Sequence, residues 1–385
     1  MANLFENWDA TKEALTDGLA GNKKAVMETV MENTKRALTE SASAGATMAG
    51  NVATLNKVIL PVIRRVMPTV IANELVGVQP MTGPVGQIHT LRVRYAETAA
   101  TATAGDEALS PFAIATGYAG NAGTGKADAT ATLEGTAGRK LSIQILKQTV
   151  EAKSRKLSAR WTFEAAQDAQ AMHGLDVEAE IMAALAQEIT AEIDQEIIGS
   201  LSSLAGTASA TYAQNAVSGT ATFVGDEHAA LAVLINKAAN DIAARTRRGA
   251  GNWVVVSPTV LTVLQSATTS AFARTTEGPF EAPTNTKLVG TLNNSMKVYV
   301  NQYAANDDVL VGYKGSSESD AAAFYCPYVP LMSSGTVLDP DTFEPVVSFM
   351  TRYGYVELNN TASSLGNAAD YLNKIAVTSN ALSFS

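Results

Sequence analysis

One long amphipathic helix is the sequence feature that most constrains the fold. Between Asp176 and Leu201 an apolar residue recurs at every fourth position. These residues are Val177, Ile181, Leu185, Ile189, Ile193, Ile197 and Leu201. Against a period of 3.6 residues, this stripe winds around the helix axis by about 40° per step. We therefore expect Asp176 to cap the helix and its successive turns to contact different partners.

Strand and helix patterns alternate in the rest of the chain. Strands are expected at Ile88–Tyr95, Leu141–Val150, Leu157–Phe163, Trp253–Val256, Met296–Tyr303, Val309–Tyr313, Ala322–Leu331 and Pro345–Leu358. A helix capped by Asp226 should run to Arg245, and Ser257-Pro258 should begin another that continues through Leu264. An amphipathic helical segment is expected within residues 1–40. Interleaved strands and helices predict an α+β fold.

Residues 96–138 are rich in Ala, Thr and Gly and lie between two expected strands. Such a composition cannot build its own core. An isolated pair of strands is not stable, so the two strands and the loop between them must pack against another surface. The segment is therefore expected to be a long loop that contacts another part of the assembly.

The low charge density bounds the class of protein. Charged residues make up 17% of the chain and hydrophobic residues 46%, which suggests that much of the surface is buried against other copies. The net charge of −9 argues against a nucleic-acid-binding protein, because phosphate neutralisation needs clustered Lys and Arg. The most apolar stretch, Val58–Val78, is interrupted by two arginines and two prolines, so no membrane span is expected.

No motif predicts a catalytic, cofactor or metal site. Residues 120–126 resemble a phosphate-binding loop, but Ala127 stands where Ser or Thr must hold Mg²⁺. None of the three histidines has the spacing of a zinc site. The acidic cluster at 339–344 could hold calcium, although its prolines favour a surface turn. The sequence therefore predicts a protein that is not an enzyme.

Charge is divided into two blocks along the chain. Arg139–Arg160 holds seven basic residues and one acid, whereas Trp161–Asn236 holds eleven acids and no Lys or Arg. Such blocks either form solvated faces or pair the basic strand of one subunit with the acidic helix of the next. On the second interpretation the candidate intersubunit contacts are Lys147, Lys153, Arg155, Lys156, Glu188, Glu192 and Glu196.

A series of short stretches points to a family. In order they are Leu60–Arg65, Gly77–Met81, Glu151–Leu157, His173-Gly174, Arg248–Trp253, Ser257-Pro258, Val298–Tyr303, Val311–Gly315, Tyr325–Leu331 and Thr351–Gly354. Together, over roughly residues 55–355, they resemble the major capsid proteins of T-even-type contractile-tailed phages. No single stretch is specific, but the colinear series is.

The resemblance implies an HK97-like capsid fold. Its parts would be an N-terminal helical segment (1–40), an N-arm (41–92), an E-loop (93–160), a P domain (161–224 with spine helix 176–201, and 321–358), an A domain (225–320) and a C-terminal extension (359–385). Two departures from the family pattern stand out. The E-loop region is too short for the insertion domain found there, and residues 359–385 extend past the family's usual end.

The resemblance also implies a function. The protein would self-assemble into hexamers and pentamers of an icosahedral phage head that encloses double-stranded DNA without sequence-specific binding. Portal and scaffold proteins, and possible cement or decoration proteins, would be its partners. It would assemble in the host cytoplasm and reside in the virion capsid. The alternative is the shell subunit of an encapsulin-type nanocompartment.

In this family a prohead protease removes an N-terminal segment after a Leu/Ile-x-Glu sequence. Leu38-Thr39-Glu40 followed by Ser41 fits that rule, which makes Glu40 and Ser41 the candidate cleavage site. The alternative explanation is a chance match, because the rule requires only three residues and their types are common. Either the segment is removed, or residues 1–40 stay as a permanent helix on the inner surface, and we favour retention.

Overall fold

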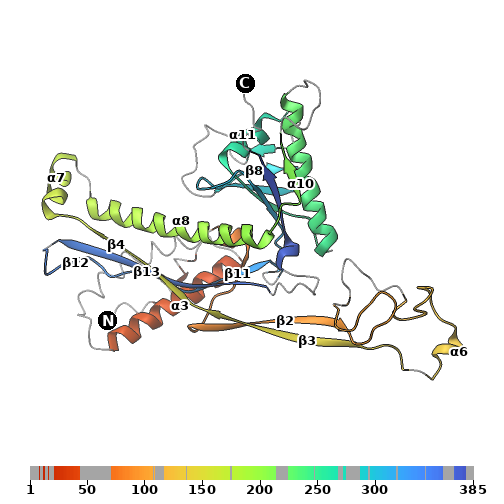
Figure 1. The fold of residues 1–385 in the computed structure, drawn as a ribbon. Coiled ribbons are helices and arrows are strands. Elements are labelled where there is room, and N and C mark those ends of the chain that lie inside the picture. The colour runs from red at the N-terminus through yellow and green to blue at the C-terminus, as the bar shows by residue number, and fades with distance from the viewer. Residues whose placement is uncertain are drawn as a thin grey trace. The chain divides into compact units, whose positions relative to one another are not determined.

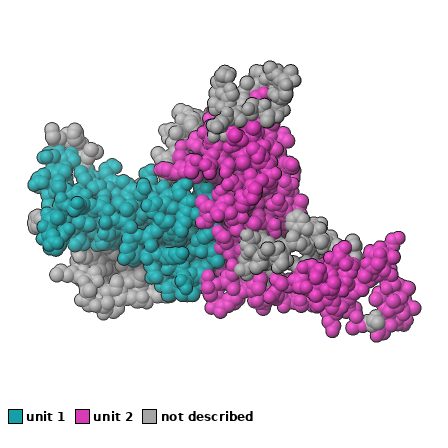
Figure 2. All heavy atoms as spheres, in the orientation of Figure 1, with its two compact units in different colours: residues 1–86, 150–198, 324–356 teal, residues 87–149, 199–323, 357–385 magenta. Residues whose placement is uncertain are grey.

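The computed structural model describes most of the chain. The described residues are 8, 12–13, 16, 21–43, 71–106, 108, 117–135, 137–173, 176–213, 224–246, 248–267, 272–274, 287–293, 295–317, 320–342, 344–358 and 368–378. Residues 44–70 of the expected N-arm and 359–367 and 379–385 of the expected extension lie outside them. Two compact units are each assembled from three stretches of chain (Figure 2). Unit 1 comprises Met1–Gly86, Val150–Ile198 and Phe324–Val356, and unit 2 comprises Gln87–Thr149, Gly199–Ala323 and Glu357–Ser385.

Unit 1 is built on a five-stranded sheet. Its strands are β1 (Gly77–Val78), β4 (Lys153–Arg160), β11 (Ala323–Ser333), β12 (Val337–Leu338) and β13 (Pro345–Glu357). Strand β4 runs antiparallel to β13, with Arg160 opposite Val346 and Lys153 opposite Tyr353. Side chains of β13 alternate between buried and half-buried, so one face of the sheet is packed.

The predicted long helix is α8 (Val177–Ala205), which extends four residues past the expected end (Figure 1). The Asp176 carboxylate caps it by accepting hydrogen bonds from the amides of Glu178 (3.1 Å) and Ala179 (3.4 Å), as predicted. The apolar stripe is buried from Leu185 onward and only partly buried before that residue.

The structure describes three further helices in unit 1: α3 (Asn22–Ser43), α5 (Ala72–Leu75) and α7 (Phe163–His173). The prediction of a strand through Phe163 is wrong in its second half. The strand ends at Arg160, and a helix begins at Phe163, where the Thr162 hydroxyl accepts a hydrogen bond from the Ala165 amide (3.3 Å). Thr is common both in strands and at helix N-caps, so Thr162 alone did not show that the strand had ended.

Unit 2 contains a seven-stranded sheet in the order β5-β14-β10-β6-β9-β8-β7. The strands are β5 (Ala210–Tyr212), β6 (Trp253–Val256), β7 (Phe272–Arg274), β8 (Lys287–Leu292), β9 (Met296–Val300), β10 (Val309–Gly312) and β14 (Leu372–Val377). Helices α10 (Val224–Thr246) and α11 (Pro258–Ser266) share one apolar core with this sheet. All four residues of β6 are buried, as expected for a central strand.

The expectation that residues 359–385 form an appended extension is wrong for residues 368–378. The short 3-10 helix η2 (Ala368–Tyr371) leads into β14, which lies between β5 and β10 inside the sheet. Strand β14 pairs antiparallel with β10 and parallel with β5. Because Ile375 is fully buried there, this segment completes the core of unit 2.

The predicted start of α11 is correct, whereas that of α10 is not. Ser257 caps α11, since its hydroxyl accepts a hydrogen bond from the Val260 amide (3.3 Å) and Pro258 occupies the first turn. Helix α10 instead begins at Val224, two residues before Asp226. Asp226 therefore lies in the first turn of the helix and is not its cap residue.

A two-stranded ribbon of β2 (Val85–Tyr95) and β3 (Leu141–Glu151) carries a tip with the one-turn helix α6 (Thr130–Leu133). The prediction that the tip lacks a core is wrong. Tyr95, Ala102, Ala108 and Tyr118 form a small buried cluster, with the two tyrosine ring centroids 4.5 Å apart. Two aromatic rings bury enough surface to organise an otherwise small-residue loop.

The α+β class predicted from the sequence is confirmed by these sheets and helices. Across the described parts of the chain, no helix has the length and apolarity required to span a membrane.

Candidate functional site

The two segments considered as phosphate-binding or calcium-binding sites, 120–126 and 339–344, are turns held by their own backbone hydrogen bonds. In the 120–126 loop the amide of Asn121 donates to the Lys126 carbonyl, and that of Gly125 donates to the Asn121 carbonyl, both at 2.9 Å. These amides are therefore engaged within the loop. At 339–344 the Asp339 amide donates to the Glu344 carbonyl (2.9 Å), which closes the turn between β12 and β13. Among the residues that the structure describes, no group of three or more His, Cys, Asp or Glu could hold a metal ion.

The basic strand β4 meets the acidic helix α8 within unit 1 of a single chain, whereas we expected them from the sequence either to meet between subunits or to face solvent. The Arg155 guanidinium contacts Glu192 Oε2 at 2.6 Å and Glu196 Oε2 at 2.5 Å. Arg155 Nε also donates to the Tyr353 hydroxyl at 2.5 Å, and that hydroxyl in turn donates to Glu196. Figure 1 shows α8 running alongside β4 and β13, the strands that carry Arg155 and Tyr353.

The electrostatics of this cluster favour the charged pair. Burial disfavours ionisation of Glu196, but the hydrogen bonds from Arg155 and Tyr353 outweigh it and lower the pKa of Glu196. Burial likewise opposes the charge of Arg155, but its hydrogen bonds to Glu196 and Tyr353 outweigh that effect and raise its pKa. The side chains of Arg155, Glu192 and Glu196 are 31%, 45% and 39% exposed, so each ion pair contributes only about 0–1 kcal/mol.

These contacts change the interpretation of three predicted intersubunit residues. Arg155, Glu192 and Glu196 contact one another within a single chain, because β4 returns beside β13 on the face that α8 covers. The other candidates, Lys147, Lys153, Lys156 and Glu188, are exposed on the single chain. A contact of any of the seven with another subunit is a proposal and is taken up below.

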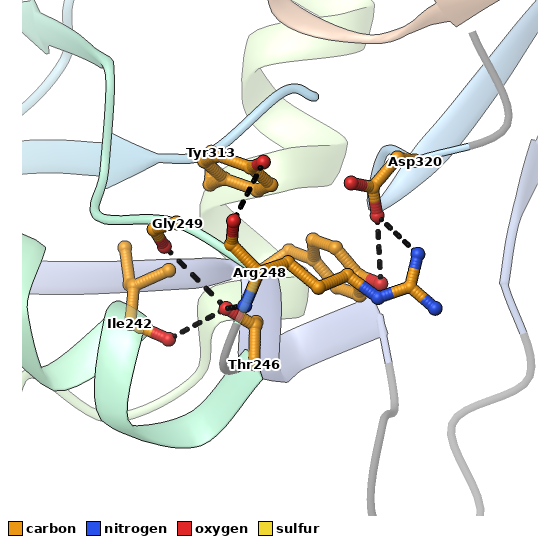
Figure 3. A network of polar contacts seen from close by, with 7 residues as sticks. Ile242, Thr246, Arg248, Gly249, Tyr313 and Asp320 are labelled. Atoms are coloured by element: carbon orange, nitrogen blue, oxygen red, sulfur yellow. Dashed lines mark hydrogen bonds and ion pairs between the residues drawn. The ribbon is translucent and has the colours of Figure 1, made fainter. Parts of the chain in front are cut away.

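Two of the family-like stretches, Arg248–Trp253 and Val311–Gly315, meet in unit 2 (Figure 3). A Cβ on Gly249 would lie 2.5 Å from Tyr313 Cε2, and one on Gly312 would overlap the Trp253 ring. Only glycine leaves room for these rings. The Asn252 side chain joins the same stretches, because it donates to the Lys314 carbonyl (2.5 Å) and accepts from the Lys314 amide (3.0 Å).

A polar network extends from this contact. Arg248 Nη1 lies 2.8 Å from Asp320 Oδ1, which also accepts a hydrogen bond from the Tyr371 hydroxyl at 3.2 Å. The Tyr313 hydroxyl donates to the Arg248 carbonyl at 3.3 Å (Figure 3). Burial raises the pKa of Tyr371 to about 12, so its hydroxyl remains a neutral donor at pH 7. Sequence reasoning missed Asp320 and Tyr371, which are far apart in the chain and belong to no motif.

Sequence reasoning also missed Asp194 on α8. Its side chain is 1% exposed, and Oδ1 accepts a hydrogen bond from the Ile71 amide at 2.9 Å. Its Oδ2 atom has no hydrogen-bond partner among the described residues. Burial raises the pKa of Asp194 to about 7. One sequence signal could have indicated that Asp194 is buried: it lies in a second row of residues spaced by four, next to the isoleucine stripe. The structure buries all members of this row, which are Ala186, Thr190, Asp194 and Ile198.

The candidate cleavage site lies inside a helix. The backbone of α3 is helical through Ser43, so Glu40 and Ser41 do not form the extended stretch that the sequence suggested. Their side chains lie outside the described residues. A peptide bond within a helix must unwind before a peptidase can bind it.

By sequence, the chain is similar to major capsid proteins of phages. The family model described as major capsid protein Gp23 matches residues 52–381. The major capsid protein of Vibrio phage KVP40 is 29% identical over 95% of this chain and 96% of its own length. That of Enterobacteria phage T4 is 30% identical over 85% of this chain and 79% of its own. The solved capsid of Myoviridae phage XM1 has a TM-score of 0.44 at 11% identity, over 79% of this chain and 90% of that one.

Proposed function

We propose that this chain, which belongs to the family of major capsid protein Gp23, self-assembles into the hexamers and pentamers of an icosahedral phage head. It is a major capsid protein of a tailed phage and a structural component of the virion capsid. The family is one of structural capsid proteins, not of enzymes. An encapsulin-type shell is not favoured, because the matching relatives are phage capsid proteins.

We assign the parts of the HK97-like fold as follows. The β2–β3 ribbon and its tip would be the E-loop, and α8 would be the spine helix of a P domain built on the sheet of unit 1. The seven-stranded sheet of unit 2 would be the A domain, now including β14. The support for this assignment is the order and type of the elements. It differs from the sequence expectation in two bounds: the ribbon begins at Val85 instead of residue 93, and β4, which was expected in the E-loop (93–160), pairs with β13 in the sheet of unit 1.

The ribbon is our candidate for the main contact with a neighbouring subunit. Leu141, Ile143 and Ile145 alternate along β3 and are 52%, 68% and 65% exposed. Because successive strand residues point to opposite faces, these three side chains form one apolar row. An exposed apolar row of this kind is typical of a surface that another molecule covers.

Charge would orient this contact. Lys147 on the ribbon and Lys153 and Lys156 on β4 are exposed and basic, and Glu188 on α8 is exposed and acidic. We propose that these residues pair across subunits, whereas Arg155 secures Glu192 and Glu196 within each subunit. Complementary charge of this kind sets register and approach more than affinity.

The remaining partners follow from family membership. A head of this class encloses double-stranded DNA, and the net charge of −9 suits a container that does not adhere to its genome. Portal, scaffold and decoration proteins are proposed partners, and assembly is proposed to occur in the host cytoplasm. We also propose that residues 1–40 are retained, because α3 is packed into unit 1 and the candidate cleavage bond is helical.

The test is assembly of the purified chain, followed by negative-stain microscopy and sedimentation. Wild-type protein should form closed shells or sheets, and the double variant Ile143→Asp, Ile145→Asp should remain a folded, unassembled subunit. The matched control is Ser142→Asp, Gln144→Asp, which places the same charges on the opposite face of β3. If the isoleucine variant assembles like the control, the ribbon is not the contact; if wild-type protein never forms shells or sheets, self-assembly is refuted.

A further inference from the structure

Helix α3 is attached to unit 1 through one apolar face. Val26, Met27, Val30 and Met31 are each at most 5% exposed. Their positions, one and four residues apart, fall on one side of a helix. Elsewhere on the same helix, Lys24 and Glu32 are exposed. A helix with this division requires a preformed apolar surface beneath it.

Polar contacts fix the position of the helix along that surface. The Asn33 side-chain amide donates to the Met81 carbonyl at 2.8 Å and to the Tyr328 carbonyl at 3.0 Å. Asn33 is 6% exposed, so both bonds are shielded from water. Near the other end of the helix, Lys23 Nζ lies 2.6 Å from Glu74 Oε1 on α5. A one-turn shift would break both contacts.

The partners of α3 come from segments distant in the sequence. Glu74 lies on α5, Met81 follows β1, and Tyr328 lies on β11. Strands β1 and β11 pair in parallel, so the two carbonyls that bind Asn33 belong to one rigid sheet edge. The receiving surface is therefore made without any residue of α3, and residues 44–70 supply the covalent connection between α3 and α5.

We propose that this surface, formed by α5, the segment after β1 and β11, is a helix-binding site that holds α3 non-covalently, so that α3 stays bound when the chain is cut between α3 and α5. Hydrolysis of one peptide bond in that connection adds one water, leaving a carboxylate on one fragment and an amine on the other. Cleavage within this connection and retention of α3 are then compatible, although the candidate bond Glu40–Ser41 itself lies inside α3. The inference does not depend on the proposed self-assembly.

The experiment places a site-specific protease sequence within residues 44–50 of the full-length chain. The purified subunit is cut completely, passed through gel filtration at micromolar concentration, and analysed by mass spectrometry under denaturing conditions. We expect the fragment containing α3 to co-elute with the larger fragment in a one-to-one ratio, and to separate from it only in denaturant. Shell formation is no part of this measurement, so its failure is distinguishable from failure of the proposed function.

Two variants test the specificity of the site. Asn33→Asp keeps the shape but removes both donors and places a carboxylate against two carbonyls, and the cut fragment should dissociate at least roughly tenfold more readily. Lys24→Asp, an exposed charge reversal on the same helix, is the matched control and should be retained like wild type. Each uncut variant is first checked for a wild-type circular dichroism spectrum. Loss of the wild-type fragment on gel filtration would overturn the proposal, as would equal retention of the Asn33→Asp and wild-type fragments.

Discussion

Replacing Asp194 by asparagine should change how the stability of the subunit depends on pH. The carboxylate is buried between α8 and the start of α5, with one oxygen bound to the Ile71 amide. A carboxamide at this position would keep an oxygen acceptor for that amide but could not ionise. The variant therefore separates the cost of a buried charge from the loss of a hydrogen bond.

The magnitude follows from linkage between folding and proton binding. Burial raises the pKa of Asp194 from 3.8 to about 7, so the folded state binds the proton more tightly than the unfolded state. The contribution of this group to the free energy of unfolding is then highest below about pH 4, decreases as pH rises, and levels off above about pH 7. At about 1.4 kcal/mol per pKa unit, the full decrease is about 4 kcal/mol.

Urea unfolding of the unassembled subunit, followed by circular dichroism at several pH values, provides the assay. Other groups titrate too, so the quantity of interest is the difference in unfolding free energy between variant and wild type. Between pH 5 and pH 7 this difference should move in favour of Asp194→Asn by about 2 kcal/mol. Thr190→Val, which removes a buried hydroxyl one turn earlier on the same helix and changes no ionisable group, should show no such trend. A pH-independent difference for Asp194→Asn would refute the assignment of a raised pKa.

Three further changes test the packing of unit 2. Gly312→Ala forces a Cβ into the Trp253 ring and should lower the free energy of unfolding by about 1–3 kcal/mol or more, measured by denaturant titration. Ser257→Ala removes the cap of α11 and a 2.7 Å hydrogen bond to Asp307, and should cost about 1–2 kcal/mol in the same measurement. A chain truncated before Ala368 lacks β14 and should lose the cooperative thermal transition of unit 2, whereas a chain ending at Thr378 should keep it; a preserved transition in the shorter chain would contradict the assigned topology.

The sequence predicted those elements whose pattern is local. Helix α8 follows from the spacing of its isoleucines, β6 from an unbroken apolar run, and the start of α11 from Ser257-Pro258. In each case the residues that specify the element lie within it. The start of helix α7 was missed because Phe163 continues the apolar pattern of the strand before it, and the Thr162 cap marks the change.

Elements fixed by distant partners could not be predicted in this way. Strand β14 has an ordinary six-residue strand pattern, but its place in the sheet, between β5 and β10, depends on two strands that lie far back in the chain. The partners of Arg155 could not be predicted for the same reason, because they lie on a distant segment of the chain. Charge blocks indicated that the basic strand meets the acidic helix, yet only the pairing of β4 with β13 places the two in one chain.

The family-like stretches explain why the family was easier to predict than the contact residues. Gly249 and Gly312 leave room for Tyr313 and Trp253, so each glycine is required by an aromatic residue of the other stretch. A change at one position needs a matching change at the other, and such paired constraints hold a motif together over long sequence separations. Surface residues such as Lys147 and Glu188 carry no such internal constraint. Their identities depend on a neighbouring surface and not on packing within the subunit, so the residues that identify the family are those that the interior of the chain constrains.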